Sequence, residues 1–170
     1  MSFDPTVHHR RSIRLNGYDY AQNGAYFVTI CTWQREYLFG NIVDGGMRLS
    51  DIGLLVEQCW RTIAAAQVQL DEFVVMPNHL HGILLLTGNN RQARVSDGTA
   101  PGSLGAIIQN FKSVSTRRVN NQRDNRGCPL WQRNYYERVI RNDAELGRAR
   151  EYIVNNPMKW DLDRENPAIA

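Results

Sequence analysis

The apolar residues of the chain recur with two periods, and each period predicts a different kind of element. Residues 26–32 (YFVTICT) are mostly aromatic or β-branched, which is typical of a strand. A polar turn that contains Gly40, Asn41, Gly45 and Gly46 follows them. The fold is therefore expected to begin with one strand and a turn.

A helix is predicted after this turn. Between Ile52 and Ala66 the apolar residues return at every third or fourth position, which places them on one face of a helix. Ser50 or Asp51 can cap the first turn of this helix by accepting a backbone hydrogen bond.

Two strands joined by a short turn are predicted next. Residues 68–76 (VQLDEFVVM) and 79–86 (HLHGILLL) are largely apolar, and Pro77-Asn78 between them marks a turn. Such an apolar hairpin is expected inside a sheet rather than at its edge.

The second half of the chain repeats this alternation. Residues 87–102 are polar and predict a flexible loop, after which Ser103 can cap a second helix. A fourth strand is predicted in the second half of residues 130–140 (LWQRNYYERVI). Residues 142–145 fit a capping box for a third helix, which must end near Pro157. The apolar face of the second helix consists of Leu104, Ile107, Ile108, Phe111 and Val114.

The order β-α-β-β-α-β-α predicts an α+β fold. Two βαβ units joined by a hairpin form a ferredoxin-like, or RRM-like, βαββαβ antiparallel sheet with helices on one face. The other face is expected to be open unless the additional C-terminal helix or a partner covers it. We expect one domain over residues 1–170, with a basic N-terminal arm (1–20), the flexible loop (87–102) and a C-terminal tail (158–170).

The composition is that of an ordinary globular protein, with 42% hydrophobic and 22% charged residues among 170. No apolar run approaches the roughly 20 residues that span a bilayer, and the N-terminus lacks the apolar core of a secretory signal. The three cysteines form no CxxC pair. We therefore expect a cytoplasmic protein without a disulfide framework, a thiolate zinc site or a membrane partner.

The net charge of +3 identifies no partner, but its distribution is uneven. Residues 107–150 contain ten basic and four acidic residues, whereas residues 36–72 contain two basic and six acidic residues. Eighteen of the twenty basic residues are Arg, whose planar guanidinium suits phosphate and stacks on bases. The basic stretch is expected to face nucleic acid, and the acidic segment is expected on the opposite, solvent-exposed side of the molecule.

The two histidines in the third predicted strand are the most specific candidates for a functional site. His79 and His81 alternate with Leu80, so both side chains are expected on one face of the strand while Leu80 faces the core. Two imidazoles at this spacing can hold one divalent ion together with a third ligand. The alternative is a pair of histidines that is only packed or hydrogen-bonded in the sheet.

The third helix offers further candidates. Tyr152 and Asn156 are four residues apart and share a helix face. Asn supplies a neutral carbonyl ligand, and Tyr supplies a phenolic nucleophile. The alternatives are a boundary tyrosine with a buried ring and hydrated hydroxyl, and an asparagine that only ends the helix before Pro157.

Aromatic residues alternate with Arg in residues 130–141 (LWQRNYYERVIR). Aromatic rings of this kind can stack on unpaired bases while the guanidinium groups bind phosphates. The alternative is that some of these rings fill the buried side of a strand. The candidate DNA-binding residues in the chain are Arg10, Arg11, Arg14, Lys112, Arg117, Arg118, Trp131, Arg133, Tyr135, Tyr136, Arg138 and Arg141.

Four segments together resemble the REP-associated tyrosine transposases of the single-tyrosine HUH transposase family. They are RRSIRLNGYDY with YFVTICT, VVMPNHLHGI, LWQRNYYERVIR and YIVNNPMKW, in this order. The resemblance implies that His79 and His81 form the metal-binding HUH pair, that Tyr152 is the catalytic tyrosine and that Asn156 is the third metal ligand.

The resemblance also implies an activity. The expected cofactor is Mg²⁺ or Mn²⁺, and the expected partner is single-stranded DNA beside a hairpin. Tyr152 would cleave this strand through a 5′-phosphotyrosine intermediate. Such a protein would work as a monomer or homodimer in the cytoplasm, associated with the nucleoid.

Three other functions are compatible with the same residues. A ferredoxin-like sheet can be a non-catalytic nucleic-acid-binding module. A metal-dependent hydrolase that uses water would leave a free 5′-phosphate and would not need Tyr152. An HUH replication initiator or relaxase would share the histidine pair and the tyrosine, although this short chain has no helicase region.

Overall fold

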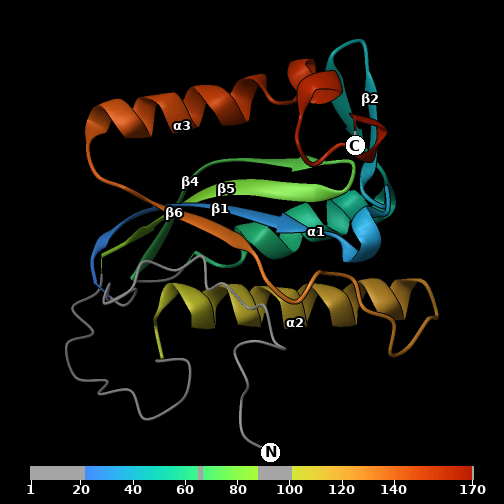
Figure 1. Cartoon of the computed structure of the whole chain (residues 1–170). Helices are drawn as coiled ribbons and strands as arrows, with labels where there is room; N and C mark the ends of the chain where they lie inside the picture. The colour runs from blue at the N-terminus through green and yellow to red at the C-terminus, as the bar shows by residue number, and fades with distance from the viewer. Residues whose placement is uncertain (1–21, 65–66, 88–100, 170) are drawn as a thin grey trace, which may run out of the picture.

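The computed structural model describes residues 22–64, 67–87 and 101–169, and its centre is a four-stranded antiparallel sheet (Figure 1). Along the sheet the order is β4-β5-β1-β6, so the first and third of these strands in the chain lie in the middle. This order is that of the predicted ferredoxin-like βαββαβ sheet. The strands are β1 (Gly24–Cys31), β4 (Val68–Met76), β5 (His79–Leu86) and β6 (Tyr136–Ile140).

Helices cover both faces of this sheet (Figure 1). The first two, α1 (Asp51–Arg61) and α2 (Leu104–Gln122), lie on one face, as predicted. The third, α3 (Asp143–Asn155), lies on the opposite face against β4 and β5. The C-terminal helix is therefore the element that covers the second face.

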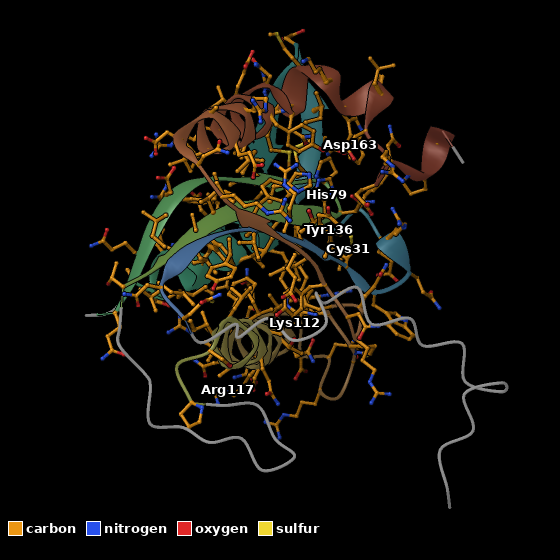
Figure 2. All side chains as sticks on the ribbon, turned by 60° about the vertical axis from the view of Figure 1, so that its left-hand side comes forward. Cys31, His79, Lys112, Arg117, Tyr136 and Asp163 are labelled. Atoms are coloured by element: carbon orange, nitrogen blue, oxygen red, sulfur yellow. The ribbon has the colours of Figure 1, made fainter. Side chains whose placement is uncertain are left out.

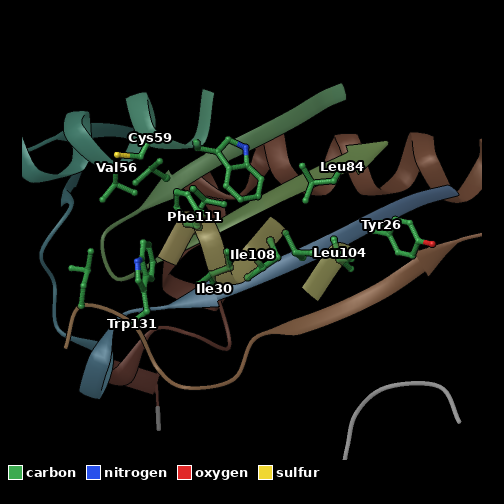
Figure 3. Packing of buried hydrophobic residues seen from close by; sticks show 14 of the residues in the cluster. Tyr26, Ile30, Val56, Cys59, Leu84, Leu104, Ile108, Phe111 and Trp131 are labelled. Carbon is green, nitrogen blue, oxygen red and sulfur yellow. The ribbon is translucent and has the colours of Figure 1, made fainter. Parts of the chain in front are cut away.

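Each face of the sheet has its own apolar core, because alternate residues of a strand point to opposite sides. On the side of α1 and α2, Ile30 of β1, Leu84 of β5 and Phe111 of α2 belong to one buried cluster (Figure 3), in which Phe111 stands edge-on to Trp60 at 5.1 Å. On the side of α3, Phe27 and Ile83 contact Ala149 and Ile153 (the smaller cluster). Burial of each large side chain stabilises the fold by about 1.5–3 kcal/mol.

The predicted helix caps are present. Ser50 Oγ accepts a hydrogen bond from the Gly53 N–H at 3.1 Å, and Ser103 Oγ accepts one from the Ala106 N–H at 3.3 Å. Asn142 Oδ1 likewise accepts the N–H of Glu145 at 2.9 Å. These bonds satisfy donors that a helix leaves without a partner in its first turn.

The first helix is shorter than its apolar spacing predicts. It ends at Arg61, and the Thr62 hydroxyl donates to the carbonyl of Cys59 at 2.7 Å. Ala66, which was expected to extend the apolar face, lies outside the described residues.

A small hairpin occupies the region that was predicted only as a turn. Strands β2 (Gly40–Val43) and β3 (Gly46–Leu49) pair antiparallel through the two-residue turn Asp44-Gly45. Both turn residues have positive φ, 52° and 74°, which matches the twist of a tight hairpin and explains the glycine. The strands are too short for their alternation to stand out in the sequence.

The predicted β4–β5 hairpin forms, but only one of its strands is internal. β5 lies between β4 and β1, whereas β4 is at an edge of the four-stranded sheet, which corrects the expectation that both would be inside. The pairing of β4 is interrupted between Leu70 and Phe73, where Asp71 and Glu72 lie. Charged residues and a bulge are typical of an edge strand.

Three 3₁₀ helices complete the described structure: η1 (Trp33–Arg35), η2 (Pro157–Leu162) and η3 (Pro167–Ile169). Most of residues 158–170, expected only as a tail, therefore has defined structure that follows directly on α3. Among the described residues, no helix is both long enough and apolar enough to cross a membrane.

Candidate active site

The two histidines of β5 lie side by side on the face covered by α3. Their Nε2 atoms are 2.9 Å apart, and both side chains are buried. Leu80 between them points into the core on the other face. The alternation of the strand thus brings the two imidazoles together as predicted.

Hydrogen bonds to the outer ring nitrogens orient both imidazoles. His79 Nδ1 is 2.8 Å from Asn78 Oδ1, and the Asn78 amide is fixed because its Nδ2 donates to the carbonyl of Glu165 at 2.8 Å. An amide oxygen only accepts, so His79 Nδ1 carries the proton and Nε2 keeps a lone pair. His81 Nδ1 is 2.8 Å from the Thr29 hydroxyl.

The environment keeps His79 neutral. Burial, and then the neighbouring His81, hold the pKa of His79 well below its ordinary value. A neutral imidazole with a free Nε2 is the form that binds a metal ion, and a fixed outer hydrogen bond is typical of metal-binding histidines.

Asp163 joins the pair from the C-terminal segment. Its Oδ2 lies 3.9 Å from His81 Nε2, and the possible ligand atoms of His79, His81 and Asp163 all lie within 4.8 Å of one another. Burial by itself would raise the pKa of Asp163, but the neighbouring His81 and the hydrogen bonds from the Glu165 N–H and Asn156 outweigh it and lower the pKa. The buried carboxylate is therefore ionised.

Sequence reasoning missed Asp163. It follows Asn156 by seven residues, beyond Pro157, and the intervening η2 helix turns the chain back toward the sheet. Neither helix nor strand periodicity predicts such a contact. The only local signal is an acidic residue in a segment expected to be a tail.

Asn156 lies at the end of α3, directly beside Asp163. Its Nδ2 donates to Asp163 Oδ2 at 2.6 Å. Its Oδ1 is buried and has no hydrogen-bond partner in the part of the chain that the structure describes. The amide carbonyl oxygen is thus available to a further group, as a ligand role requires.

Tyr152 precedes Asn156 by one helical turn and reaches the same group. Its hydroxyl is 3.5 Å from both His81 Nε2 and Asp163 Oδ2, and its ring lies 5.2 Å from that of His81. The side chain is half-exposed. Burial, then the charges of Asp163 and Glu165, raise the pKa of Tyr152 to about 12, so the phenol is protonated at neutral pH.

Contacts around Glu165 fasten the C-terminal segment to the sheet. Glu165 forms an ion pair with Arg35 and accepts a hydrogen bond from the Cys31 thiol at 3.1 Å. Burial and the Glu165 carboxylate raise the pKa of Cys31 to about 12. Cys31 is therefore a protonated thiol. The form of cysteine that binds soft metals is the thiolate.

A bidentate ion pair fastens α3 to the edge strand. Arg150 Nε and Nη2 donate to the two carboxylate oxygens of Asp71 at 2.8 and 2.6 Å. Hydrogen bonding to Arg150 lowers the pKa of Asp71. Arg150 is two residues from Tyr152, so this ion pair helps to hold the tyrosine helix over the histidine pair.

Two predicted DNA-binding residues lie in the same pocket as these groups. The pocket has a volume of about 540 Å³ and is lined by Tyr152, His81, Asp163, Tyr136 and Arg138, among others. The register explains this, because Thr29 of β1 pairs with both Tyr136 and His81 and so places all three on one face.

Other predicted DNA-binding residues lie on the opposite side of the sheet. Lys112, Arg117 and Arg133 line a separate pocket of about 410 Å³ beside α2. Figure 2 shows Lys112 and Arg117 on the α2 side, away from His79 and Asp163. Arg118, also on α2, is exposed with its guanidinium near the Cys59 sulfur.

Lys112 fastens a loop. Its Nζ donates to the carbonyls of Gln132, Arg133 and Asn134 at 2.8, 3.4 and 2.9 Å, which occupies all three donors. Burial lowers its pKa to about 8. A phosphate would have to compete with these three carbonyls for the ammonium group.

The expected stacking role of Trp131 is wrong. The indole is buried, packs between Phe39 and Phe111, and donates to Ser115 Oγ at 2.8 Å. Tyr135 is partly buried against the same core, whereas Tyr136 is exposed. Alternation along the segment decides which rings are buried.

The position of the basic stretch (residues 107–150) in the sequence suggested that it forms one DNA-facing side. The structure shows that it does not. Arg117 and Arg118 lie on α2, whereas Arg148 and Arg150 lie on α3 across the sheet. Arg141 is exposed before α3. The three arginines expected in the N-terminal arm, Arg10, Arg11 and Arg14, lie outside the described residues, as do residues 88–100 of the predicted loop.

Comparisons with known proteins identify relatives of this chain. The family model for IS200-like transposases matches residues 21–156. An uncharacterised Haemophilus influenzae protein is 40% identical over 174 residues, which cover 95% of this chain and 96% of its own. A second protein of that organism, provisionally named a REP-associated tyrosine transposase, is 23% identical over 149 residues, covering 83% and 74%.

A solved structure shares the fold. The structure of a REP-associated tyrosine transposase bound to a REP hairpin superposes with a TM-score of 0.54 at 17% identity. The superposition covers 89% of this chain and 76% of the other.

Proposed function

Because this chain belongs to the IS200-like transposase family, we propose that it is a metal-dependent enzyme that cleaves and rejoins single-stranded DNA through Tyr152. The observation that carries the proposal is the Tyr152 hydroxyl 3.5 Å from both His81 and Asp163. These two residues belong to a buried group that can bind a metal ion. A hairpin-flanked strand is the proposed substrate, since the solved REP-associated transposase is bound to a REP hairpin.

The residues of the site fit a divalent cation. His79 and His81 would bind it through their Nε2 atoms and Asp163 through a carboxylate oxygen, with the unpartnered Oδ1 of Asn156 completing the set. Nitrogen and oxygen donors without a thiolate favour Mg²⁺ or Mn²⁺ over a structural zinc ion. When bound, such an ion supplies Lewis-acid polarisation of a phosphate oxygen.

Tyr152 carries the covalent step. Its phenolic oxygen attacks the phosphorus atom, which forms the P–O bond to tyrosine and breaks the bond between phosphorus and the 3′ oxygen. The phenolic proton is released to water, and the 3′ oxygen takes up a proton from water as it leaves as a hydroxyl, so that no net proton is gained or lost. The products are a 5′-phosphotyrosine and a free 3′-OH.

Rejoining is the same step in reverse. A DNA 3′-OH attacks the phosphotyrosine, the bond between phosphorus and Tyr152 breaks, and the phenol regains its proton. Because one phosphodiester is exchanged for another, no ATP is consumed. Strand transfer of this kind is the chemistry that a transposase needs.

The test uses a hairpin-bearing single-stranded oligonucleotide with Mg²⁺ or Mn²⁺. The wild type should form a protein–DNA adduct that survives denaturation, and Tyr152→Phe should form none. Tyr136→Phe is the matched control, because Tyr136 lines the same pocket and should leave the adduct intact.

Two results would contradict the proposal. An adduct with Tyr152→Phe would show that another residue is the nucleophile. Cleavage to a free 5′-phosphate, without any adduct and equally in both tyrosine variants, would indicate a hydrolase that uses water.

A further inference from the structure

The arginines around the active site differ in whether a carboxylate already binds their guanidinium. Arg35 pairs with Glu165, and Arg150 pairs with Asp71. Arg138, Arg148 and Arg164 also lie near the site, and within the described residues none of them forms an ion pair. The first two arginines fasten elements together, while the other three can bind an anion from solution.

The three unpaired arginines come from different elements but line one pocket, the same one that contains Tyr152. Arg138 lies on β6, and Arg164 directly follows the candidate ligand Asp163. Arg148 lies four residues before Tyr152 on α3, so the two side chains share a helix face. The fold thus collects three guanidiniums around the proposed nucleophile.

The two carboxylates of the pocket do not neutralise these arginines. Asp163 is bound by Asn156 and lies against the histidine pair, and Glu165 is bound by Arg35 and Cys31. Guanidinium groups bind phosphate through paired N–H donors, which a lysine cannot reproduce. The pocket therefore combines a metal-binding group with a surplus of phosphate-binding side chains.

We propose that Arg138, Arg148 and Arg164 form a phosphate clamp, in which Arg148 binds the phosphate that Tyr152 attacks and the other two bind neighbouring phosphates of the same strand. This inference rests on the proposed function. It adds Arg148 and Arg164, which the pattern of aromatic and basic residues did not indicate, to the DNA-binding residues.

The test measures binding without cleavage. In a Tyr152→Phe background, with metal removed by a chelator, the affinity for a short fluorescent single-stranded oligonucleotide is measured by anisotropy at several salt concentrations. Arg148→Gln and Arg164→Gln should each weaken binding about tenfold at low salt, the loss expected for one charge-assisted contact. Each should also reduce the salt slope of log K by about 0.7.

Two controls separate a clamp from general charge. Arg48→Gln removes an equal charge from an exposed residue of β3 that does not line the pocket and is not a candidate DNA-binding residue, and it should change neither quantity appreciably. Arg148→Lys should keep the salt slope of the parent protein. Its affinity should lie between those of Arg148→Gln and the parent, because a lysine lacks the paired donors. Thermal unfolding of every variant should match the parent, since both arginines are exposed.

The clamp is overturned if Arg148→Gln and Arg164→Gln bind like the parent, or if Arg48→Gln loses as much affinity as they do. These results are independent of the test of Tyr152. An adduct with unaffected clamp variants would contradict the clamp alone. Selective loss of binding without any adduct in the wild type would support the clamp and contradict the proposed cleavage.

Discussion

Asn156 Nδ2 donates a hydrogen bond to Asp163 Oδ2 at 2.6 Å, and this contact joins the end of α3 to the C-terminal segment. The same Asp163 oxygen lies 3.9 Å from His81 and 3.5 Å from the Tyr152 hydroxyl. One carboxylate therefore links the tyrosine helix, the histidine strand and the segment after Pro157. The candidate metal group and the candidate nucleophile are held as one unit.

Replacing Asp163 should weaken metal binding. Asp163→Asn removes the only anionic member of the His79–His81–Asp163 group, so the affinity for Mn²⁺ should fall by at least about tenfold to a hundredfold. Calorimetric titration of the DNA-free protein measures this directly. Asp161→Asn is the matched control, because Asp161 is exposed and belongs to a different pocket. Equal affinity in the Asp163→Asn variant and the wild type would exclude a ligand role.

The metal-free protein should lose stability below about pH 6.5. The pKa of His79 is lowered in the folded state from its ordinary value of 6.5, so the unfolded chain binds the proton more readily. The stabilisation is complete above pH 6.5 and is lost as the pH falls, by up to about 1.4 kcal/mol per pH unit for one proton.

Denaturant unfolding of wild type and His79→Asn between pH 5 and 8 checks this. The variant has no titrating imidazole at this position, so its free energy of unfolding should depend less steeply on pH. Parallel curves for the two proteins would show that His79 titrates normally.

Two glycines should respond in opposite ways to alanine. A Cβ at Gly82 would lie 2.5 Å from the Trp60 ring, so Gly82→Ala should destabilise the fold by about 1–3 kcal/mol. At Gly147, in α3, a Cβ meets nothing within 4 Å, and Gly147→Ala should stabilise the protein by about 0.5–1 kcal/mol. Thermal unfolding of both variants measures the difference. Equal effects would mean that the helix α3 or the Trp60 contact is placed wrongly.

Trp131 and Tyr136 should separate stability from DNA binding. Trp131→Ala removes a buried ring and its hydrogen bond to Ser115, and should cost about 3–5 kcal/mol of stability. Tyr136→Ala removes an exposed ring in the active-site pocket, and should weaken binding of single-stranded DNA while unfolding stays nearly unchanged. Loss of stability in the second variant only would reverse these roles.

The sequence by itself determined most of the elements and the common face of His79 and His81, and it singled out Tyr152 as the candidate nucleophile. The spacing of apolar residues in a strand or helix depends only on residues close together in the chain. That spacing therefore predicts the four sheet strands, the three capped helices and the common face of His79 and His81. The short β2–β3 hairpin escaped because its strands are too brief to show a period.

Only the tertiary structure decided what surrounds the site. Asp163 lies beside the two histidines because the chain reverses direction after Pro157. The spacing of apolar residues does not predict such a contact between distant segments of the chain. The roles of the basic and aromatic residues were decided in the same way. Trp131 is buried in the core, Lys112 binds loop carbonyls, and Arg148 lines the same pocket as Arg138 and Arg164. A side chain's partners depend on which faces the sheet and helices bury, and that is a property of the whole packed chain.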